Sequence, residues 1–195
     1  MSEPFVSIIV PVHNGANYIE NCIYSLMRLN YPKEKYEVIV VDNKSTDNTA
    51  GIIKKFAVKY AQEDQIQTSY AARNKGIQTA IGDIMAFTDA DCIADENWIL
   101  NGVKPFENRH IGGVGGQVKA YKPSNYIERY QARKDVFGQE KHLSKENLLK
   151  RNGKIVTCNA LYSKHVFEKA GLFEPTLVSG GDYDFSLKKG SVKYT

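Results

Sequence analysis

The sequence has little of what marks secreted, zinc-binding or membrane-spanning chains. Its 195 residues hold three cysteines, an odd number without a C-x-x-C pair, which argues against a zinc site or a disulfide framework. No apolar stretch approaches the length that crosses a bilayer, and no segment resembles a nucleic-acid-binding module. We therefore expect a cytoplasmic protein with no nucleic-acid partner and with buried cysteines. They are Cys22, Cys92 and Cys158.

The start of the sequence does not resemble a secretory leader. The apolar run from Phe5 to Val10 has no basic flank and no small-residue cleavage site, and Pro11 interrupts it. The run is therefore predicted to be a first β-strand and not a signal peptide. At this length one domain, 1–195, is the default expectation.

Positive charge is concentrated in one part of the chain. The formal net charge is +4. Residues 119–154 hold ten Lys and Arg against four Asp and Glu, a local charge of +6 that leaves −2 for the rest. The simpler interpretation is a solvated helix face. The second is attraction to anionic lipid head groups or to a phosphorylated partner, with the protein peripheral at the inner face of a membrane.

The first half of the sequence alternates between two patterns of apolar residues. Runs rich in β-branched residues alternate with segments whose apolar residues lie three or four apart, which is typical of strands alternating with helices. Strands are predicted at 5–10, 36–41, 66–69 and 84–88, and helices at 19–27, 49–60 and 71–81.

The pattern is looser after residue 100. The glycine-rich stretch 112–118 lacks the Lys-Ser or Lys-Thr of a phosphate-binding loop and is predicted to begin a strand. Further on, a helix is predicted at 124–137, with Tyr126, Tyr130 and Phe137 along one side, then a strand at 154–162 and a short helix at 164–170.

This order predicts an α/β fold, a mostly parallel sheet sandwiched by helices. In such sheets ligands bind beyond the carboxyl ends of the strands. Polar residues follow three of the predicted strands, at 11–14, 42–43 and 89–91. Because the ends of parallel strands meet at one edge, we expect the ligand there.

The most informative of these strand ends carries Asp89 and Asp91. Residues i and i+2 of an extended segment point the same way, so both carboxylates would face one ligand. Like charges so close share a cation or a proton, and oxygen ligands favour Mg²⁺ or Mn²⁺. The alternative is helix capping by Asp91 or Asp95. Asp42 has the alternative of a turn residue, and Arg73 that of a surface helix residue.

Taken together, five segments resemble the family 2 glycosyltransferases, enzymes with the Rossmann-like GT-A fold. The resemblance covers about residues 5–189. It implies inverting transfer of a sugar from a nucleotide-diphosphate sugar, with UDP the expected nucleotide, to a saccharide or lipid-linked acceptor, as in cell-surface polysaccharide or glycolipid synthesis. The segments are VSIIVPVHNGANYIENCIYSL, YEVIVVDNKSTDNT, ARNKGI, GDIMAFTDADC and GGDYDFSLK.

The resemblance also implies which residues hold the nucleotide. Asp42 would contact the base, and Arg73 would lie beside the nucleotide. Asp89 and Asp91 would touch the ribose and hold a divalent metal, Mn²⁺ or Mg²⁺, on the diphosphate. The residues that would line the nucleotide along the first strand and its loop are Pro11, Val12, His13 and Asn14.

Asp182 of the late G-G-D-x-D segment matches the catalytic base of the family. A divalent cation neutralises a leaving diphosphate, and a positioned carboxylate deprotonates the attacking hydroxyl. The alternative is a turn followed by a helix capped by Asp182 or Asp184. The preceding glycines suit either a turn or a loop that an acceptor approaches closely.

The sequence departs from the family in two ways. Many members have an acidic residue before the base, where this chain has Gly181. Members also continue further, so we expect a chain truncated at the C-terminus, with 1–100 as the nucleotide-binding half and 101–195 as an incomplete acceptor-side half. The rival hypotheses are a non-catalytic module that binds sugar nucleotides and a nucleotidyltransferase. The second would need a basic glycine-rich loop near the first strand, which PVHNGANY does not provide.

Overall fold

The structure is a computed structural model that describes residues 3–121, 155–188 and 193–194. Strands and helices alternate through its first half, as expected. The strands are β1 (Val6–Val12), β2 (Tyr36–Asp42), β3 (Lys59–Gln62), β4 (Ile84–Thr88), β5 (Ile111–Gly115), β6 (Asn159–Ser163) and β7 (Lys193–Tyr194). The helices are α1 (Ile19–Met27), α2 (Thr49–Ile53), α3 (Ser69–Thr79), α4 (Trp98–Gly102), α8 (Lys164–Ala170) and α9 (Gly181–Lys188), with 3₁₀ turns at Lys33–Lys35 and Lys104–Glu107.

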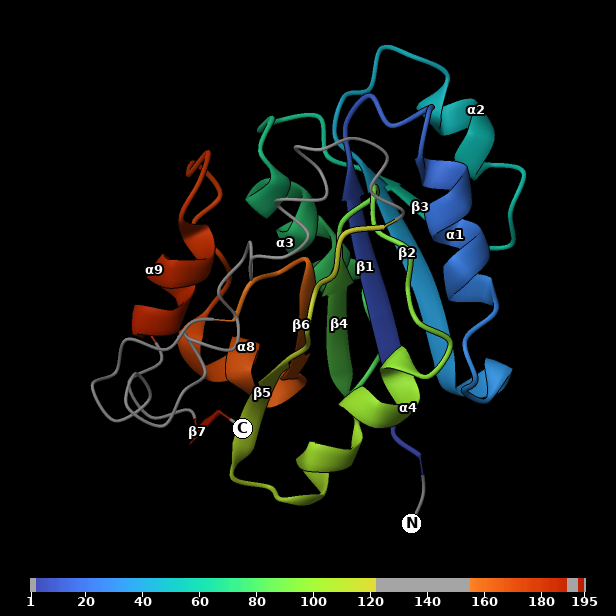
Figure 1. The fold of residues 1–195 in the computed structure, drawn as a ribbon. Helices are drawn as coiled ribbons and strands as arrows, with labels where there is room; N and C mark the ends of the chain where they lie inside the picture. The colour runs from blue at the N-terminus through green and yellow to red at the C-terminus, as the bar shows by residue number, and fades with distance from the viewer. Residues whose placement is uncertain (1–2, 122–154, 189–192, 195) are drawn as a thin grey trace.

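The strands form one sheet in the order β3-β2-β1-β4-β6-β5-β7 (Figure 1). β3, β2, β1 and β4 are mutually parallel, whereas β6 runs antiparallel to both β4 and β5. The chain moves from β1 toward β3 and then crosses back to place β4 on the other side of β1. In sheets of this type the crevice at such a reversal is the usual ligand site.

Helices cover both faces of the sheet, as the sequence predicted (Figure 1). Alternate residues of β1 point to opposite faces, so Ile8 packs with α1, α2 and α4 while Ile9 packs with α3, α8 and α9. β1 is buried along its whole length, as expected of a central parallel strand. α3 lies very close to the sheet, because a Cβ on Gly76 would meet Ile9 Cγ2 at 2.4 Å.

One predicted helix and one predicted strand are wrong. The helix expected to reach Tyr60 ends at Ile53, and Tyr60 lies in strand β3. No strand forms at 66–69, where Thr68 caps α3 by accepting the amide of Ala71. The apolar residues Phe56 and Tyr60 fit helical spacing, but Val58 and Tyr60 also alternate with exposed Lys59 as on an edge strand.

In the second half the predicted short helix matches α8, and the glycine-rich stretch does begin β5. The predicted strand at 154–162 is shorter, because pairing with β4 starts at Asn159. The predicted helix at 124–137 lies outside the described residues. Cys22 and Cys158 are buried as expected, but Cys92 is only partly buried. In the described part of the chain no helix is both long and apolar enough to cross a membrane.

Candidate donor-binding site

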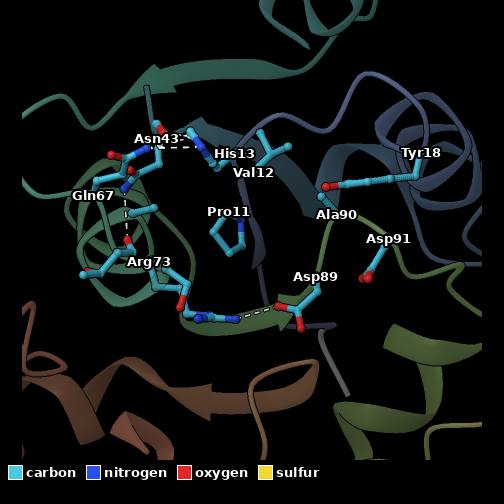
Figure 2. A pocket seen from close by; sticks show the side chains of 13 residues that line it. Pro11, Val12, His13, Tyr18, Asn43, Gln67, Arg73, Asp89, Ala90 and Asp91 are labelled. Carbon is cyan, nitrogen blue, oxygen red and sulfur yellow. Dashed lines mark hydrogen bonds and ion pairs between the residues drawn. The ribbon is translucent and has the colours of Figure 1, made fainter. Parts of the chain in front are cut away.

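A pocket of about 350 Å³ opens beyond the carboxyl ends of β1, β2 and β4 (Figure 2). Its position is the edge that the sequence predicted from the three polar strand ends. The helix α3 forms one wall, and the turn after β4 forms the opposite wall. The residues around it are Pro11, Val12, His13, Tyr18, Asn43, Gln67, Thr68, Ser69, Ala72, Arg73, Asp89, Ala90 and Asp91.

Asp89 and Asp91 both border this pocket, as predicted. They do not lie on an extended segment, however, as the sequence analysis assumed. The strand ends at Thr88, and the amide of Cys92 donates to the carbonyl of Asp89 at 3.1 Å. The two aspartates therefore lie on a tight turn and not on an extended segment. Asp91 is exposed and does not cap α4, whereas Asp95 accepts the amide of Asn97 at the start of that helix.

Arg73 is the charged partner of Asp89. Its Nη2 lies 2.6 Å from Asp89 Oδ1 (Figure 2). The side chain of Arg73 is 5% exposed, against 39% for that of Asp89. Arg73 is therefore no surface helix residue. Its Nε is buried without a hydrogen-bond partner among the described residues. An unpaired buried donor is costly, so this nitrogen is a place where a polar ligand atom would be stabilised.

Asp42 does not border the pocket. It is 3% exposed, and its carboxylate accepts the hydroxyl of Tyr60 and the amide of Ser45, both at 3.0 Å. Burial and the bond to Asp42 raise the pKa of Tyr60 to about 12. Its neighbour Asn43 borders the pocket instead. The Asn43 side chain also stabilises the loop between β3 and α3, because it donates to the carbonyls of Ile66 and Thr68.

In the loop after β1, one residue borders the pocket and the next one stabilises the loop. His13 is exposed at the pocket, with Nδ1 2.7 Å from the Asn43 carbonyl and Nε2 3.1 Å from Gln67 Nε2 (Figure 2). Asn14 has φ 50° and lies outside the lining. Its Oδ1 accepts the amide of Thr46 at 2.8 Å, which joins the loops after β1 and β2.

Asp182 lies in the first turn of α9, after Gly181, so neither it nor Asp184 is the residue that precedes the helix. Burial raises the pKa of Asp182, although the charge of Arg73 and hydrogen bonds from Thr157 oppose the shift. Its Oδ1 is buried and has no partner in the described part of the chain. Arg73 thus pairs with Asp89, and its charge also acts on Asp182.

The structure therefore gathers most of the predicted residues. Pro11, Val12, His13, Arg73, Asp89 and Asp91 border one pocket, Asp182 lies near Arg73, and Asp42 and Asn14 support the pocket from outside. Sequence reasoning missed Gln67, Ser69 and Tyr18. Gln67 and Ser69 carry no local signal, whereas Tyr18 could have been noticed as an aromatic residue in the first strand's loop.

Asp89 and Asp91, the two carboxylates of the turn after β4, are the candidate ligands of a divalent metal. No three His, Cys, Asp or Glu side chains in the described ranges group closely enough to hold a metal alone. Mg²⁺ usually takes one or two carboxylates and completes its shell with waters and substrate phosphates. Exposed Asp91 beside half-exposed Asp89 is an oxygen-only pair, which fits a metal that binds together with a diphosphate.

Curated relatives are similar along nearly the whole chain. Glycosyltransferase AglE of Haloferax volcanii is 37% identical over 98% of this chain. A dolichyl N-acetyl-alpha-D-glucosaminyl phosphate 3-beta-D-2,3-diacetamido-2,3-dideoxy-beta-D-glucuronosyltransferase of Methanococcus voltae is 28% identical over 98%. The chain spans 63% and 64% of the lengths of these two relatives.

Solved structures share the fold. The mannosyltransferase PcManGT of Pyrobaculum calidifontis, in complex with GDP-Man and Mn²⁺, matches with a TM-score of 0.76 and 25% identity, over 100% of this chain and 55% of its own. TarS of S. aureus, in complex with UDP-GlcNAc, matches with a TM-score of 0.74 and 20% identity, over 98% and 56%. The GT-A fold is thereby confirmed.

A family model described as Glycosyl transferase family 2 matches residues 7–171. That range contains β2, β3, β4, all of β1 except its first residue, and every residue that borders the pocket. The chain belongs to glycosyl transferase family 2.

Proposed function

We propose that this chain is the donor-binding and catalytic part of a glycosyltransferase. It transfers a sugar from a nucleotide-diphosphate sugar to a hydroxyl group of a saccharide or lipid-linked acceptor, with inversion and with a divalent metal. The observation that carries the proposal is the pocket at the sheet reversal, which is lined by Asp91 and by the Arg73–Asp89 ion pair. The whole chain, 1–195, is proposed to act as one domain, with its donor side in 1–100.

Different residues act on the donor and on the acceptor. Asp91, with Asp89, would hold Mn²⁺ or Mg²⁺, which when bound neutralises the leaving diphosphate as a Lewis acid. Arg73 fixes the carboxylate of Asp89 through its ion pair. Asp182 takes the proton of the acceptor hydroxyl, and the raised pKa of this carboxyl brings it closer to neutral pH, which favours a general base.

The donor nucleotide is proposed to be bound by the loops after β1 and β2. His13, Asn43 and Gln67 present polar atoms there, whereas Asp42 acts through Tyr60 and Ser45 to hold the loop in place. We propose UDP as the nucleotide. The relatives with solved complexes include one with a GDP sugar and one with a UDP sugar, so both are tested below.

The test is a donor screen on the purified chain. UDP- and GDP-linked sugars are offered with Mn²⁺, with Mg²⁺ and with EDTA, and the released nucleotide is measured without acceptor and with simple saccharides or a lipid-linked sugar. We expect metal-dependent release from one donor, increased by one class of acceptor. No release from any donor under any condition contradicts the proposal.

The same screen separates the rival functions. A non-catalytic module would bind a nucleotide and metal by calorimetry and release nothing. A nucleotidyltransferase would consume a nucleoside triphosphate and a sugar phosphate, but membership of family 2 argues against it.

A further inference from the structure

Helix α3 joins the two carboxylate sites that the proposed function needs. Tyr70 and Arg73 lie three residues apart and so share one face of the helix, with Arg73 Cζ 5.5 Å from the centre of the Tyr70 ring. Arg73 reaches Asp89 from this face. Tyr70 lies on the side of Asp182, whose charge influences the phenol.

The chain before α9 is fastened to the same helix. Asn74 donates to the carbonyl of Phe173 at 2.8 Å and accepts its amide at 3.1 Å, and Thr68 donates to the carbonyl of Pro175 at 2.5 Å. The ring of Phe173 then packs on that of Phe185 in α9, with centroids 4.3 Å apart. Segment 173–185 is therefore held against α3 at several points.

Gly181, the residue before Asp182, packs directly against Tyr70. A Cβ placed on Gly181 would lie 2.5 to 2.7 Å from three carbons of the Tyr70 ring, so the ring occupies the space of the absent side chain. Burial raises the pKa of Tyr70, and the backbone amides of Asp182 and Gly181 oppose that rise, which indicates that the phenol oxygen is close to the start of α9. The first amides of a helix have no partner within it, and in this first turn the amides of Tyr183 and Asp184 bond back to the Gly180 carbonyl.

We propose that Tyr70 is a positioning residue for Asp182. Its hydroxyl accepts the amides of Gly181 and Asp182 at the start of α9, and its ring fixes the distance between α3 and the turn that carries the carboxylate. Because residue 181 is glycine, the ring has room against the start of α9. The inference rests on the proposed function, because it gives Asp182 the role of base.

Tyr70→Phe tests the anchor, since it keeps the ring and removes only the hydroxyl. Hydrogen–deuterium exchange is followed by mass spectrometry on peptides from 177–188, together with steady-state kinetics. We expect faster exchange at the start of α9, a kcat reduced about 10- to 100-fold by misplacement of the base, and a donor KM near the wild-type value. Gly181→Ala, which pushes the turn off the ring, should give the same pattern of kinetics.

The matched control is Tyr31→Phe. Tyr31 is equally buried, donates to the Pro4 carbonyl at 2.7 Å, and lies at the opposite end of the sheet. It should lose comparable stability and keep its kinetics and its exchange at 177–188. Unchanged exchange in Tyr70→Phe overturns the anchor, and unchanged kcat overturns the positioning role. A wild-type chain that consumes no donor refutes the proposed function, while the exchange measurement still decides whether the anchor exists.

Discussion

The aspartates in and behind the pocket have two different roles, structural support and ligand binding, and burial distinguishes the two. Asp42 is inaccessible and fully engaged with Tyr60 and Ser45, so its carboxylate organises the loop. Asp91 is exposed on the pocket wall. The first kind is expected to affect folding when it is changed, and the second kind to affect ligand binding alone.

Asp91→Ala is therefore expected to remove metal-dependent nucleotide binding without unfolding the protein. An exposed carboxylate outside any cap changes stability by only about 0.5 kcal/mol or less. Calorimetry with UDP, with and without Mn²⁺, should show that the metal-dependent gain in affinity is lost. Asp83→Ala is the control, because Asp83 is also exposed but precedes β4 at the other end of the strand. A variant that keeps its manganese-dependent affinity would show that Asp91 is not a ligand.

Asp182→Asn is expected to keep nucleotide and metal binding and to lower sugar transfer by roughly 10²- to 10⁴-fold, the usual contribution of a general base. The change preserves shape and removes the proton acceptor. The measurement is the rate of transfer at saturating donor, beside the donor affinity. Loss of donor affinity with an unchanged rate would assign Asp182 to the donor side.

The same substitution should alter the pH dependence of stability. Burial raises the pKa of Asp182 in the folded protein, so folding is favoured while the group is protonated and loses stability as the pH rises from the unfolded pKa through the folded pKa. Asn cannot ionise and avoids this loss. We expect Asp182→Asn to melt higher than the wild type at pH 7 and to lose that advantage near pH 3. A variant that melts lower at pH 7 would contradict the desolvation argument.

At the scale of elements, the sequence predicted best where local and tertiary preferences agree. β4 and α8 match their predicted bounds because each has a consistent apolar pattern and flanking residues that end it. The helix expected to reach Tyr60 failed because the same apolar residues serve an edge strand, whose pairing with β2 is not local. The antiparallel insertion of β6 beside β4, and the Arg73–Asp89 pair, likewise depend on distant contacts that no sequence period reports.

One largely buried carboxylate, that of Glu37, links β1, β2 and β3. Glu37 accepts the hydroxyl of Ser7 at 2.5 Å and the amide of Ile81 at 3.0 Å, and its other oxygen lies 2.5 Å from Lys59 Nζ. Burial alone would raise the pKa of Glu37, but the bonds from Lys59, Ser7 and Ile81 outweigh it and lower the pKa. Its stabilisation is therefore present above the unfolded pKa and lost as the pH falls through the folded pKa.

Glu37→Gln should lower the free energy of unfolding at pH 7 by about 1.5–3 kcal/mol, the usual contribution of hydrogen bonds to a charged group. The difference should shrink as acid protonates Glu37 in the wild type. Urea unfolding at pH 7 and near pH 3 measures both. Glu96→Gln is the control, because its pair with Arg28 is 60% to 75% exposed and contributes little. Equal losses in the two variants would contradict the role of burial.

At the scale of the whole chain, charge is asymmetric in sequence, with +6 in 119–154 and −2 elsewhere. Most of that basic segment lies outside the described residues, so its contact with a membrane stays a prediction from the sequence. A lipid-linked acceptor would have to meet the proposed base Asp182 at a membrane surface. A basic segment on the acceptor-side half of the chain would bring the pocket to that surface.

We expect the chain to co-sediment with vesicles that contain anionic lipid at low salt and to be released at about 1 M salt, because screening shortens electrostatic attraction to a few ångströms. Replacing Lys150 and Arg151 by Glu should weaken this binding strongly. The matched control replaces Lys54 and Lys55 by Glu. It changes the net charge by the same amount, at exposed positions in the first half of the chain. If both pairs weaken binding equally, net charge is responsible and the basic segment has no special role. If the wild-type chain stays in the supernatant at low salt, the membrane hypothesis is wrong.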